Sequence, residues 1–233
     1  MGLRPIQDTD LGVVIIAGGA GLRLRSALDG LPKALAPLGE GTLLDHQLQQ
    51  LAPLGAAQTC VLACARHQAA AIGEALQGRA ALLTEAEPLG TAGGLHLLPE
   101  GPSRWLTINV DHVSDVNLVD FVAQAQGPCT ALVHQKRVTI DEGVVIVRDG
   151  PLGPQLAGWQ ERPSVAVEVT AGLYVFSAAA LRRACTGQRI DMPALVSALM
   201  PAGVRAHRHS GVFIDAGTPE RLAAAAAFVA RAR

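Results

Sequence analysis

The sequence predicts an α/β protein in which a mainly parallel β-sheet is flanked by helices. The first observation is the short β-branched run Val13–Ile16, which is typical of a strand buried on both faces and is followed directly by glycines. The second is that such runs alternate with helical patterns through the first half of the chain, an order that produces parallel strands joined by crossover helices. We therefore expect ligands to bind at the carboxyl ends of the strands.

The expected elements of the first half follow from hydrophobic periodicity. Strands are expected at 60–65, 80–84, 105–110 and 130–134, and helices at 43–51, 68–76, 92–98 and 118–125. The first of these helices has leucines at helical spacing, and Thr42 stands where an N-cap residue is preferred.

The second half has a different pattern. Tight-turn residues and short strand-like runs predict a β-meander over 143–160. A strand is expected at 168–176, helices at 178–185 and 192–200, and one further strand at 206–215. Pro219 is placed to open an alanine-rich terminal helix. Because no change of composition marks a boundary, we expect a single domain over 1–233 with a β-rich lobe.

Composition excludes several functional classes. Nineteen basic and 20 acidic residues leave a formal charge of −1, which favours neither a nucleic-acid nor a membrane partner. No apolar run is long enough to span a membrane, and residues 1–10 lack the apolar core of a secretory leader. The four cysteines show no C-x-x-C spacing and are expected to be reduced, so we expect a cytoplasmic protein. The sequence does not indicate the oligomeric state.

The glycine stretch after Val13–Ile16 has the character of an anion cradle. Its glycines remove the Cβ atoms that would keep a ligand from the backbone N–H groups, and Arg23 and Lys33 add positive charge. A polyphosphate suits this arrangement. A dinucleotide fingerprint would need glycine at Leu24, and a Walker loop would need Ser or Thr at Ala34.

Two segments carry a resemblance to a known family. Residues 18–24 read G-G-A-G-L-R-L and residues 32–37 read P-K-A-L-A-P. Together they resemble the signature of sugar-1-phosphate nucleotidyltransferases, G-G-x-G-T-R-L followed by P-K-x-L-x-P, with Leu22 in place of the threonine. The resemblance implies a Rossmann-like, mainly parallel sheet flanked by helices, with a small β-rich sugar-binding lobe. It also implies transfer of a nucleoside monophosphate from a nucleoside triphosphate to a sugar 1-phosphate, with release of pyrophosphate.

The same resemblance assigns roles at the phosphates. Arg23 would bind the departing pyrophosphate, and Lys33 would neutralise charge on the α-phosphate. The nucleotide-binding residues of this segment would be Ala17, Gly18, Gly19, Gly21 and Arg23.

A second loop, residues 85–93, resembles the family's base-binding pattern E-x-E-P-L-G-T-A-G. The resemblance implies nucleotide contacts from Glu85, Gly90 and Thr91. A carboxylate only accepts hydrogen bonds, and guanine offers two adjacent donors where uracil and thymine offer one flanked by acceptors. We therefore expect GTP as the nucleotide. The alternative is that Glu85 only caps the turn that follows it.

Two aspartates end predicted strands. Asp111 closes N-V-D, which resembles the family's N-G-D, and Asp215 opens D-A-G-T-P-E, which matches D-x-G-T-P-E. By resemblance the two carboxylates hold Mg²⁺, whose preferred ligands are oxygens. The implied catalytic residues are Arg23, Lys33, Asp111 and Asp215. A helix-cap role is the alternative for Asp111, and His112 is expected to point away from it.

Sugar-phosphate contacts are implied by three weaker matches. Residues 159–163, W-Q-E-R-P, resemble the family's F-x-E-K-P and assign Glu161 and Arg162. Gly143 matches Y-G-V-V, with Glu142 for the tyrosine, and Thr170 replaces the asparagine of N-A-G-I-Y-V-F. Because these substitutions fall on sugar contacts, they leave the identity of the sugar open.

Among members of the family, L-R-S at 24–26 and F-I-D-A-G-T at 213–218 are most similar to heptose-1-phosphate guanylyltransferases. This similarity implies GTP and D-glycero-D-manno-heptose 1-phosphate as substrates for surface polysaccharide synthesis. Mannose-1-phosphate guanylyltransferase and N-acetylmuramate-1-phosphate uridylyltransferase remain alternatives. A non-catalytic NDP-sugar-binding relative is the alternative of another class.

Overall fold

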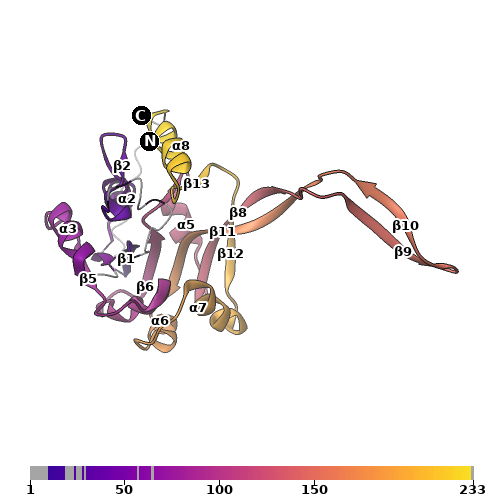
Figure 1. Ribbon diagram of the computed structural model, residues 1–233. Helices are drawn as coiled ribbons and strands as arrows, with labels where there is room; N and C mark the ends of the chain where they lie inside the picture. Colours follow the sequence, from indigo (N-terminus) through magenta and orange to yellow (C-terminus); the bar gives the residue numbers. More distant parts are fainter. Residues whose placement is uncertain are drawn as a thin grey trace, which may run out of the picture.

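The computed structural model describes residues 10–18, 24, 28, 30–56, 58–63 and 66–231, and its centre is a seven-stranded sheet in the order β12-β8-β11-β6-β1-β4-β5 (Figure 1). The strands are β1 Leu11–Ile16, β4 Gln58–Ala63, β5 Ala81–Thr84, β6 Arg104–Asn109, β8 Cys129–Thr139, β11 Ser164–Ser177 and β12 Arg205–His209. Only β11 runs antiparallel to its two neighbours, β6 and β8. The other four pairs are parallel, which confirms the expected fold class.

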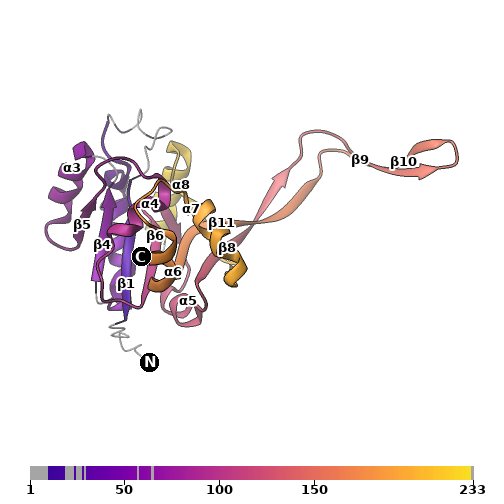
Figure 2. The ribbon, with the colours of Figure 1, turned by 90° about the horizontal axis from the view of Figure 1, so that it is seen from below.

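Helices cover both faces of this sheet (Figures 1 and 2). They are α2 Leu43–Leu51, α3 Arg66–Leu76, α4 Gly90–Gly93, α5 Leu118–Gln124, α6 Ala178–Ala184, α7 Met192–Leu199 and α8 Pro219–Arg231, with 3-10 helices η2 Lys33–Leu35, η3 Ala52–Leu54, η4 Gly94–Leu97 and η5 Met200–Ala202. Alternate residues of β1 enter two separate apolar cores, because successive side chains of a strand point to opposite faces. Val13 belongs to the same core as Phe121 of α5, and Val14 to the same core as Leu195 of α7.

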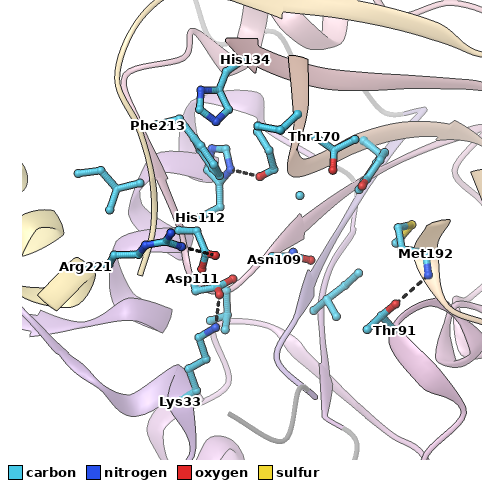
Figure 3. Close-up of a pocket in the computed structure, with 18 of the residues that line it drawn as sticks. Lys33, Thr91, Asn109, Asp111, His112, His134, Thr170, Met192, Phe213 and Arg221 are labelled. Carbon is cyan, nitrogen blue, oxygen red and sulfur yellow. Dashed lines mark hydrogen bonds and ion pairs between the residues drawn. The ribbon is translucent and has the colours of Figure 1, made fainter. Parts of the chain in front are cut away.

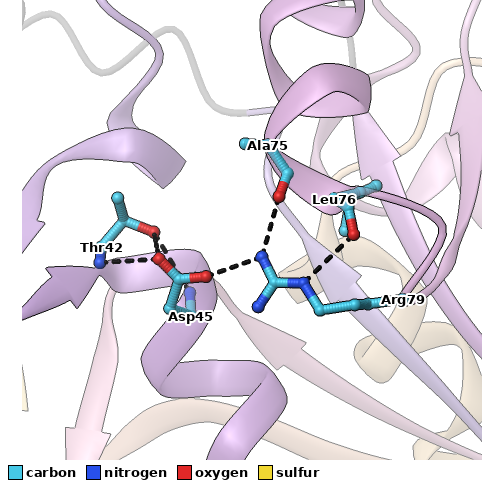
Figure 4. Close-up of polar contacts among 5 residues, drawn as sticks. All are labelled: Thr42, Asp45, Ala75, Leu76 and Arg79. Atoms are coloured by element: carbon cyan, nitrogen blue, oxygen red, sulfur yellow. Dashed lines mark hydrogen bonds and ion pairs between the residues drawn. The ribbon is translucent and has the colours of Figure 1, made fainter.

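Helix α2 begins as the sequence predicts. The Thr42 hydroxyl accepts a hydrogen bond from the Asp45 backbone N–H, and the Asp45 carboxylate accepts from the Thr42 backbone N–H at 2.9 Å, which completes a capping box (Figure 4). Arg79 bonds the same carboxylate at 2.7 Å and the Ala75 and Leu76 carbonyls at the end of α3. Burial raises the pKa of Asp45, but these hydrogen bonds outweigh it and lower the pKa. The contact ties α2 to α3.

The strand expected at 206–215 is in fact two strands in different sheets. β12 ends at His209, and β13, Phe213–Asp215, pairs antiparallel with β7, His112–Ser114, outside the central sheet. The chain turns between them at Gly211, where a Cβ would collide with the Asp115 carboxylate, and that carboxylate accepts from the Val212 N–H at 2.7 Å. Hydrophobic pattern cannot reveal this side-chain contact.

A further two-stranded sheet joins β2, Pro37–Leu38, to β3, Gly41–Thr42.

The β-meander expected at 143–160 forms a hairpin rather than a compact lobe. Strands β9, Val144–Gly150, and β10, Gly153–Gln160, pair with each other alone. They extend the ribbon that β8 and β11 make beyond the central sheet, and the whole segment projects from the body of the molecule (Figures 1 and 2). We call residues 135–168 the arm. The strands were predicted, but their separation from the body was not.

The described residues bear on two expectations, the reduced state of the cysteines and the lack of a membrane-spanning helix. Cys60, Cys129 and Cys185 are buried free thiols, while Cys64 lies outside the described residues. Burial raises the pKa of each of the three thiols, to about 11 or 12. Among the described helices, none has the length and apolar character needed to cross a membrane.

Candidate active site

A cavity of about 810 Å³ opens at the carboxyl ends of β1 and β6 (Figure 3). This volume is within the usual range for small-molecule sites, and the position is the one expected for a parallel sheet. Predicted site residues from six separate segments line it, namely Ala17, Lys33, Thr91, Asp111, Thr170 and Asp215.

Three charged groups converge at one end of the cavity. The Lys33 ammonium, at the start of η2, donates to the Asp111 carboxylate, which follows β6. Asp215 comes from the end of β13. A Cβ on Gly217 would lie 2.8 Å from Asp215 Oδ1, 3.4 Å from Lys33 Nζ and 3.5 Å from Asp111 Oδ2. The absence of a side chain at Gly217 therefore leaves the space in which these three groups meet.

The Asp215 carboxyl group is in an unfavourable environment for a negative charge. Burial raises its pKa, and the adjacent Asp111 raises it further through a hydrogen bond and like charge, while Lys33 and Arg221 offset part of the effect. Asp215 Oδ2 accepts from Arg221 at 3.1 Å, but the buried Oδ1 has no hydrogen-bond partner among the described residues. Two crowded carboxylates with an unpartnered oxygen fit a hard divalent cation such as Mg²⁺.

No group of three or more His, Cys, Asp or Glu side chains that could hold a metal occurs in the described part of the chain. A cation at Asp111 and Asp215 would therefore complete its shell with substrate oxygens and waters, as Mg²⁺ commonly does.

Backbone contacts set the spacing of the two acids. The Ala216 N–H donates to the Asp111 carbonyl at 2.9 Å, and Asp215 pairs with His112 in the β13–β7 ladder. The fully buried Gln47 of α2 donates its amide N–H groups to the carbonyls of Val110 and His112. Gln47 was not predicted, because a glutamine in an amphipathic helix carries no signal of a buried role.

His112 lines the cavity, and its ring extends to the opposite side from the Asp111 carboxylate, as expected (Figure 3). Its ring is 1% exposed, with Nδ1 2.7 Å from the Ala171 carbonyl oxygen and Nε2 2.7 Å from the Ser114 hydroxyl. Burial lowers the pKa of His112 to about 4. With both ring nitrogens occupied, the neutral imidazole holds β7 against β11.

Glu85 lies beyond the end of β5 and is 1% exposed. Neither carboxylate oxygen has a hydrogen-bond partner among the described residues. A Cβ on Gly94 would collide with Oε1, so glycine there is needed for the carboxylate to fit. The turn-cap alternative requires a backbone N–H donor to the carboxylate, and the described residues provide none. A buried acceptor without a donor is costly unless a ligand supplies one.

Gly90 and Thr91 lie where two short helices meet. Gly90 has φ +83°, and a Cβ would lie 2.6 Å from the Ile190 carbonyl oxygen. The Asp191 carboxylate accepts from the Thr91 N–H at 3.0 Å, and the Thr91 hydroxyl accepts from the Met192 N–H at 2.7 Å. Each helix, α4 and α7, therefore caps the other. Asp191 was not predicted, because its partner is 100 residues away in the sequence.

At the predicted phosphate cradle, Ala17 is buried, lines the cavity and donates its N–H to the Leu62 carbonyl at 2.9 Å. Gly18 follows it at the end of β1. Three further predicted residues, Gly19, Gly21 and Arg23, lie outside the described residues.

The predicted sugar-phosphate residues do not all meet. Thr170 lines the cavity, but Gly143, Glu161 and Arg162 belong to the arm. Arg162 pairs there with Asp141 at 2.7 Å, and Glu161 accepts from the Trp159 indole N–H at 3.0 Å. Arg162 precedes β11 by two residues and Thr170 by eight, and eight residues of extended strand span about 26 Å. The nearer cation is Lys136 of β8, which lines the cavity and was not predicted.

Comparison with known proteins identifies relatives. The chain is 30% identical over 184 residues to the mannose-1-phosphate guanylyltransferase catalytic subunit beta of Danio rerio, covering 73% of this chain and 51% of that protein. It is 28% identical over 187 residues to a probable mannose-1-phosphate guanylyltransferase of Oryza sativa, covering 73% of this chain and 51% of that protein. The chain thus spans about half the length of the curated relatives it matches.

Solved structures share the fold. HddC from Yersinia pseudotuberculosis superimposes with a TM-score of 0.68 at 19% identity, covering 94% of this chain and 99% of that one. A second structure is that of a Bacillus anthracis protein crystallised with sucrose and provisionally assigned as a glucose-1-phosphate thymidylyltransferase. It superimposes with a TM-score of 0.70 at 17% identity, covering 94% of this chain and 94% of that one. The profile of the MobA-like NTP transferase domain matches residues 13–213. This chain therefore belongs to the MobA-like NTP transferase domain family.

Proposed function

We propose that this protein transfers GMP from GTP to a sugar 1-phosphate and releases pyrophosphate. The observation that supports this most directly is the convergence of Lys33, Asp111 and Asp215 in the cavity. In this reaction an oxygen of the sugar phosphate attacks the α-phosphorus of GTP in line, and the bond from that phosphorus to the β-phosphate oxygen breaks. Such a transfer depends on positioning and charge neutralisation more than on covalent catalysis.

The roles of the three residues follow from their charges. Asp111 and Asp215 would hold Mg²⁺, which when bound neutralises phosphate oxygens. Lys33 would then exchange its contact with Asp111 for the α-phosphate, where negative charge grows during the transfer. Arg23 remains proposed, by resemblance, as the ligand of the pyrophosphate.

Guanine is supported by Glu85. Its two buried, unpartnered oxygens suit the adjacent N1–H and N2–H donors of guanine. The names of the curated relatives include mannose-1-phosphate guanylyltransferase, and HddC has also been solved in complex with GMP-PN, a guanine nucleotide. The sugar we propose is D-glycero-D-manno-heptose 1-phosphate, with mannose 1-phosphate as the second candidate because the curated relatives are named for it.

The experiment is a substrate matrix. GTP, UTP, dTTP and CTP are each combined with the 1-phosphates of the heptose, mannose and N-acetylmuramate in the presence of Mg²⁺, and pyrophosphate release is measured. We expect turnover with GTP and a manno-configured sugar. A preference for UTP would contradict the role given to Glu85, and tight NDP-sugar binding without turnover would identify a non-catalytic relative.

A substitution sharpens the assignment of the base. We expect Glu85→Gln to lower kcat/KM for GTP by about 10- to 100-fold, the range for loss of one bidentate base contact. Glu87→Gln, an exposed acid two residues along the same loop, is the matched control and should stay near wild type. An unchanged kcat/KM for GTP in Glu85→Gln would remove Glu85 from base recognition.

A further inference from the structure

Lys136 is a cation of the cavity that no acid of the described chain neutralises. Three Lys or Arg side chains line the cavity in the part of the chain that the structure describes. One of them, Lys33, contacts Asp111, and a second, Arg221, pairs with Asp215 at 3.1 Å. The third, Lys136, has no carboxylate partner among the described residues. It is therefore available to an anionic ligand.

The position of Lys136 follows from the direction of β8. Strands β8 and β6 both run antiparallel to β11, which lies between them, so they are parallel to each other. Lys136 lies near the carboxyl end of β8, and Asp111 follows the carboxyl end of β6. The two strands are two spacings apart, or about 10 Å, and Thr170 of β11 lines the cavity between them. Asp111 and Lys136 therefore face one cavity from the two sides of β11.

The face of β8 that carries Lys136 also contacts the strand of the second acid. His134 is two residues from Lys136, and both side chains line the cavity. The His134 ring lies against Phe213, with ring centroids 4.5 Å apart (Figure 3). Phe213 begins β13, which ends at Asp215. This contact holds the base of the arm against the proposed metal site.

The strand neighbours of Lys136 supply no counter-ion. Val167 lies opposite it in β11, and the next residue, Glu168, is on the other face, where it pairs with Arg208. Burial lowers the pKa of His134, and the positive charge of Lys136 adds to the effect. A bound anion would relieve this repulsion between like charges.

The proposed reaction needs a cation at the sugar phosphate, because this anion must approach an α-phosphate that is also negative. The E-R-P segment at 161–163 would assign that role to Arg162. Arg162 is instead paired with Asp141 on the arm and does not line the cavity. Lys136 does line it, and a lysine binds phosphate as a compact charge on a flexible stem.

We propose that Lys136 binds the phosphate of the sugar 1-phosphate and holds its attacking oxygen toward the α-phosphorus. The inference rests on the proposed function and places the cation for the second substrate on β8 rather than in the E-R-P segment. Lys33 and Lys136 then act on different phosphates. Lys33 neutralises the α-phosphate, and Lys136 neutralises the phosphate that attacks it.

Steady-state kinetics test this division of roles. Pyrophosphate release is measured with GTP and Mg²⁺ while mannose 1-phosphate or D-glycero-D-manno-heptose 1-phosphate is varied. Lys136→Ala should raise KM for the sugar 1-phosphate about 10- to 100-fold, the range for one hydrogen bond to a charged group. KM for GTP should stay within about threefold of wild type. Lys136→Arg keeps the charge and should recover most of the loss.

The neighbouring residue of β8 provides a matched control. Arg137 is also an exposed cation, but it alternates to the opposite face and does not line the cavity. Arg137→Ala should leave KM for the sugar 1-phosphate within about threefold of wild type. Equal effects of Lys136→Ala and Arg137→Ala, or a larger effect of Arg162→Ala, would overturn the proposal.

Inorganic phosphate separates a contact with the phosphate from a contact with the sugar. It should inhibit competitively against the sugar 1-phosphate, and Lys136→Ala should raise its inhibition constant by a factor similar to the rise in KM. An unchanged inhibition constant beside a raised KM would place Lys136 on the sugar and overturn the assignment.

The wild type distinguishes failure of this inference from failure of the proposed function. Calorimetry with each sugar 1-phosphate, Mg²⁺ and a non-hydrolysable GTP analogue measures binding without turnover, and Lys136→Ala should weaken it by the same 10- to 100-fold. A wild type that neither binds nor turns over a sugar 1-phosphate would overturn both. An active wild type with an unaltered Lys136→Ala variant would overturn this inference alone.

Discussion

Two nearly identical segments of this chain have opposite environments. Val13-Val14-Ile15-Ile16 lies in β1, where the four residues are between 0% and 9% exposed. Val144-Val145-Ile146-Val147 lies in β9, where Val145, Ile146 and Val147 are 38%, 52% and 54% exposed. Both segments are strands. The difference shows that β-branched residues specify an extended backbone, whereas burial depends on which other segments the chain brings alongside.

The connections explain the difference. Strand β1 receives parallel partners on both sides, β4 and β6, because long connections containing helices return the chain to its edges. Strand β9 is joined to β10 by the turn residues Pro151 and Leu152, which Gly153 follows with φ +99°, and β9 gains no partner on its other edge in the described structure. The body therefore supplies the cavity, to which only Lys136 at the base of the arm contributes, and the arm carries most of the exposed large hydrophobic side chains.

The largest effect expected from this division concerns catalysis. Lys33→Ala should lower kcat about 10²- to 10³-fold with a smaller change in KM for GTP, because the ammonium stabilises charge that develops only in the transition state. Arg162→Ala removes a cation from the arm and should leave kcat within about threefold of wild type. Steady-state pyrophosphate release measures both. A loss in Arg162→Ala as large as that in Lys33→Ala would show that the arm reaches a reacting site.

Substitution of the two tryptophans compares the body with the arm in their effect on stability. Trp105→Ala should destabilise the body by about 3–5 kcal/mol, because it empties a fully packed position in the core. Trp159→Ala should change the free energy of unfolding by less than about 0.5 kcal/mol. Urea unfolding measures both changes. Equal losses would mean that the arm is part of the folded core.

A pH dependence follows from His112 in the body. Its pKa is about 4 in the folded chain and 6.5 when exposed, so the unfolded state binds a proton first as the pH falls. The contribution of His112 to the free energy of unfolding is therefore fully present above pH 6.5 and is lost toward pH 4. The loss is about 3 kcal/mol, at 1.36 kcal/mol for each pKa unit. His112→Gln should lack this component in urea unfolding across the range. A parallel pH profile in the two proteins would show that His112 does not titrate as proposed.

The smallest effect is at the α2 cap. Thr42→Ala removes the side-chain acceptor for the Asp45 N–H and should cost about 1 kcal/mol of stability without altering kcat. Thr42→Ser retains the hydroxyl and should remain close to wild type. Thermal unfolding measures the change, and identical stability of the alanine and serine variants would show that the capping box contributes nothing.

Much of the fold was predictable because it depends on local pattern. Period-2 and period-3.6 repeats located the strands and helices, and Thr42 and Pro219 marked two helix starts correctly. The division of 206–215 into β12 and β13 was not predictable, since it depends on the contact of Asp115 with a backbone N–H almost 100 residues away. Reciprocal capping between Thr91 and Asp191 depends on a contact over a similar separation.

For the candidate site, sequence by itself determined the chemistry: which carboxylates, which lysine and which glycines stand at the ends of strands. Tertiary structure decided which of them meet. Lys33, Asp111, Thr170 and Asp215 line one cavity, whereas Glu161 and Arg162 extend away on the arm. The physical reason is that residue type sets charge and backbone preference locally, but distance and burial are set by packing between segments far apart in the chain.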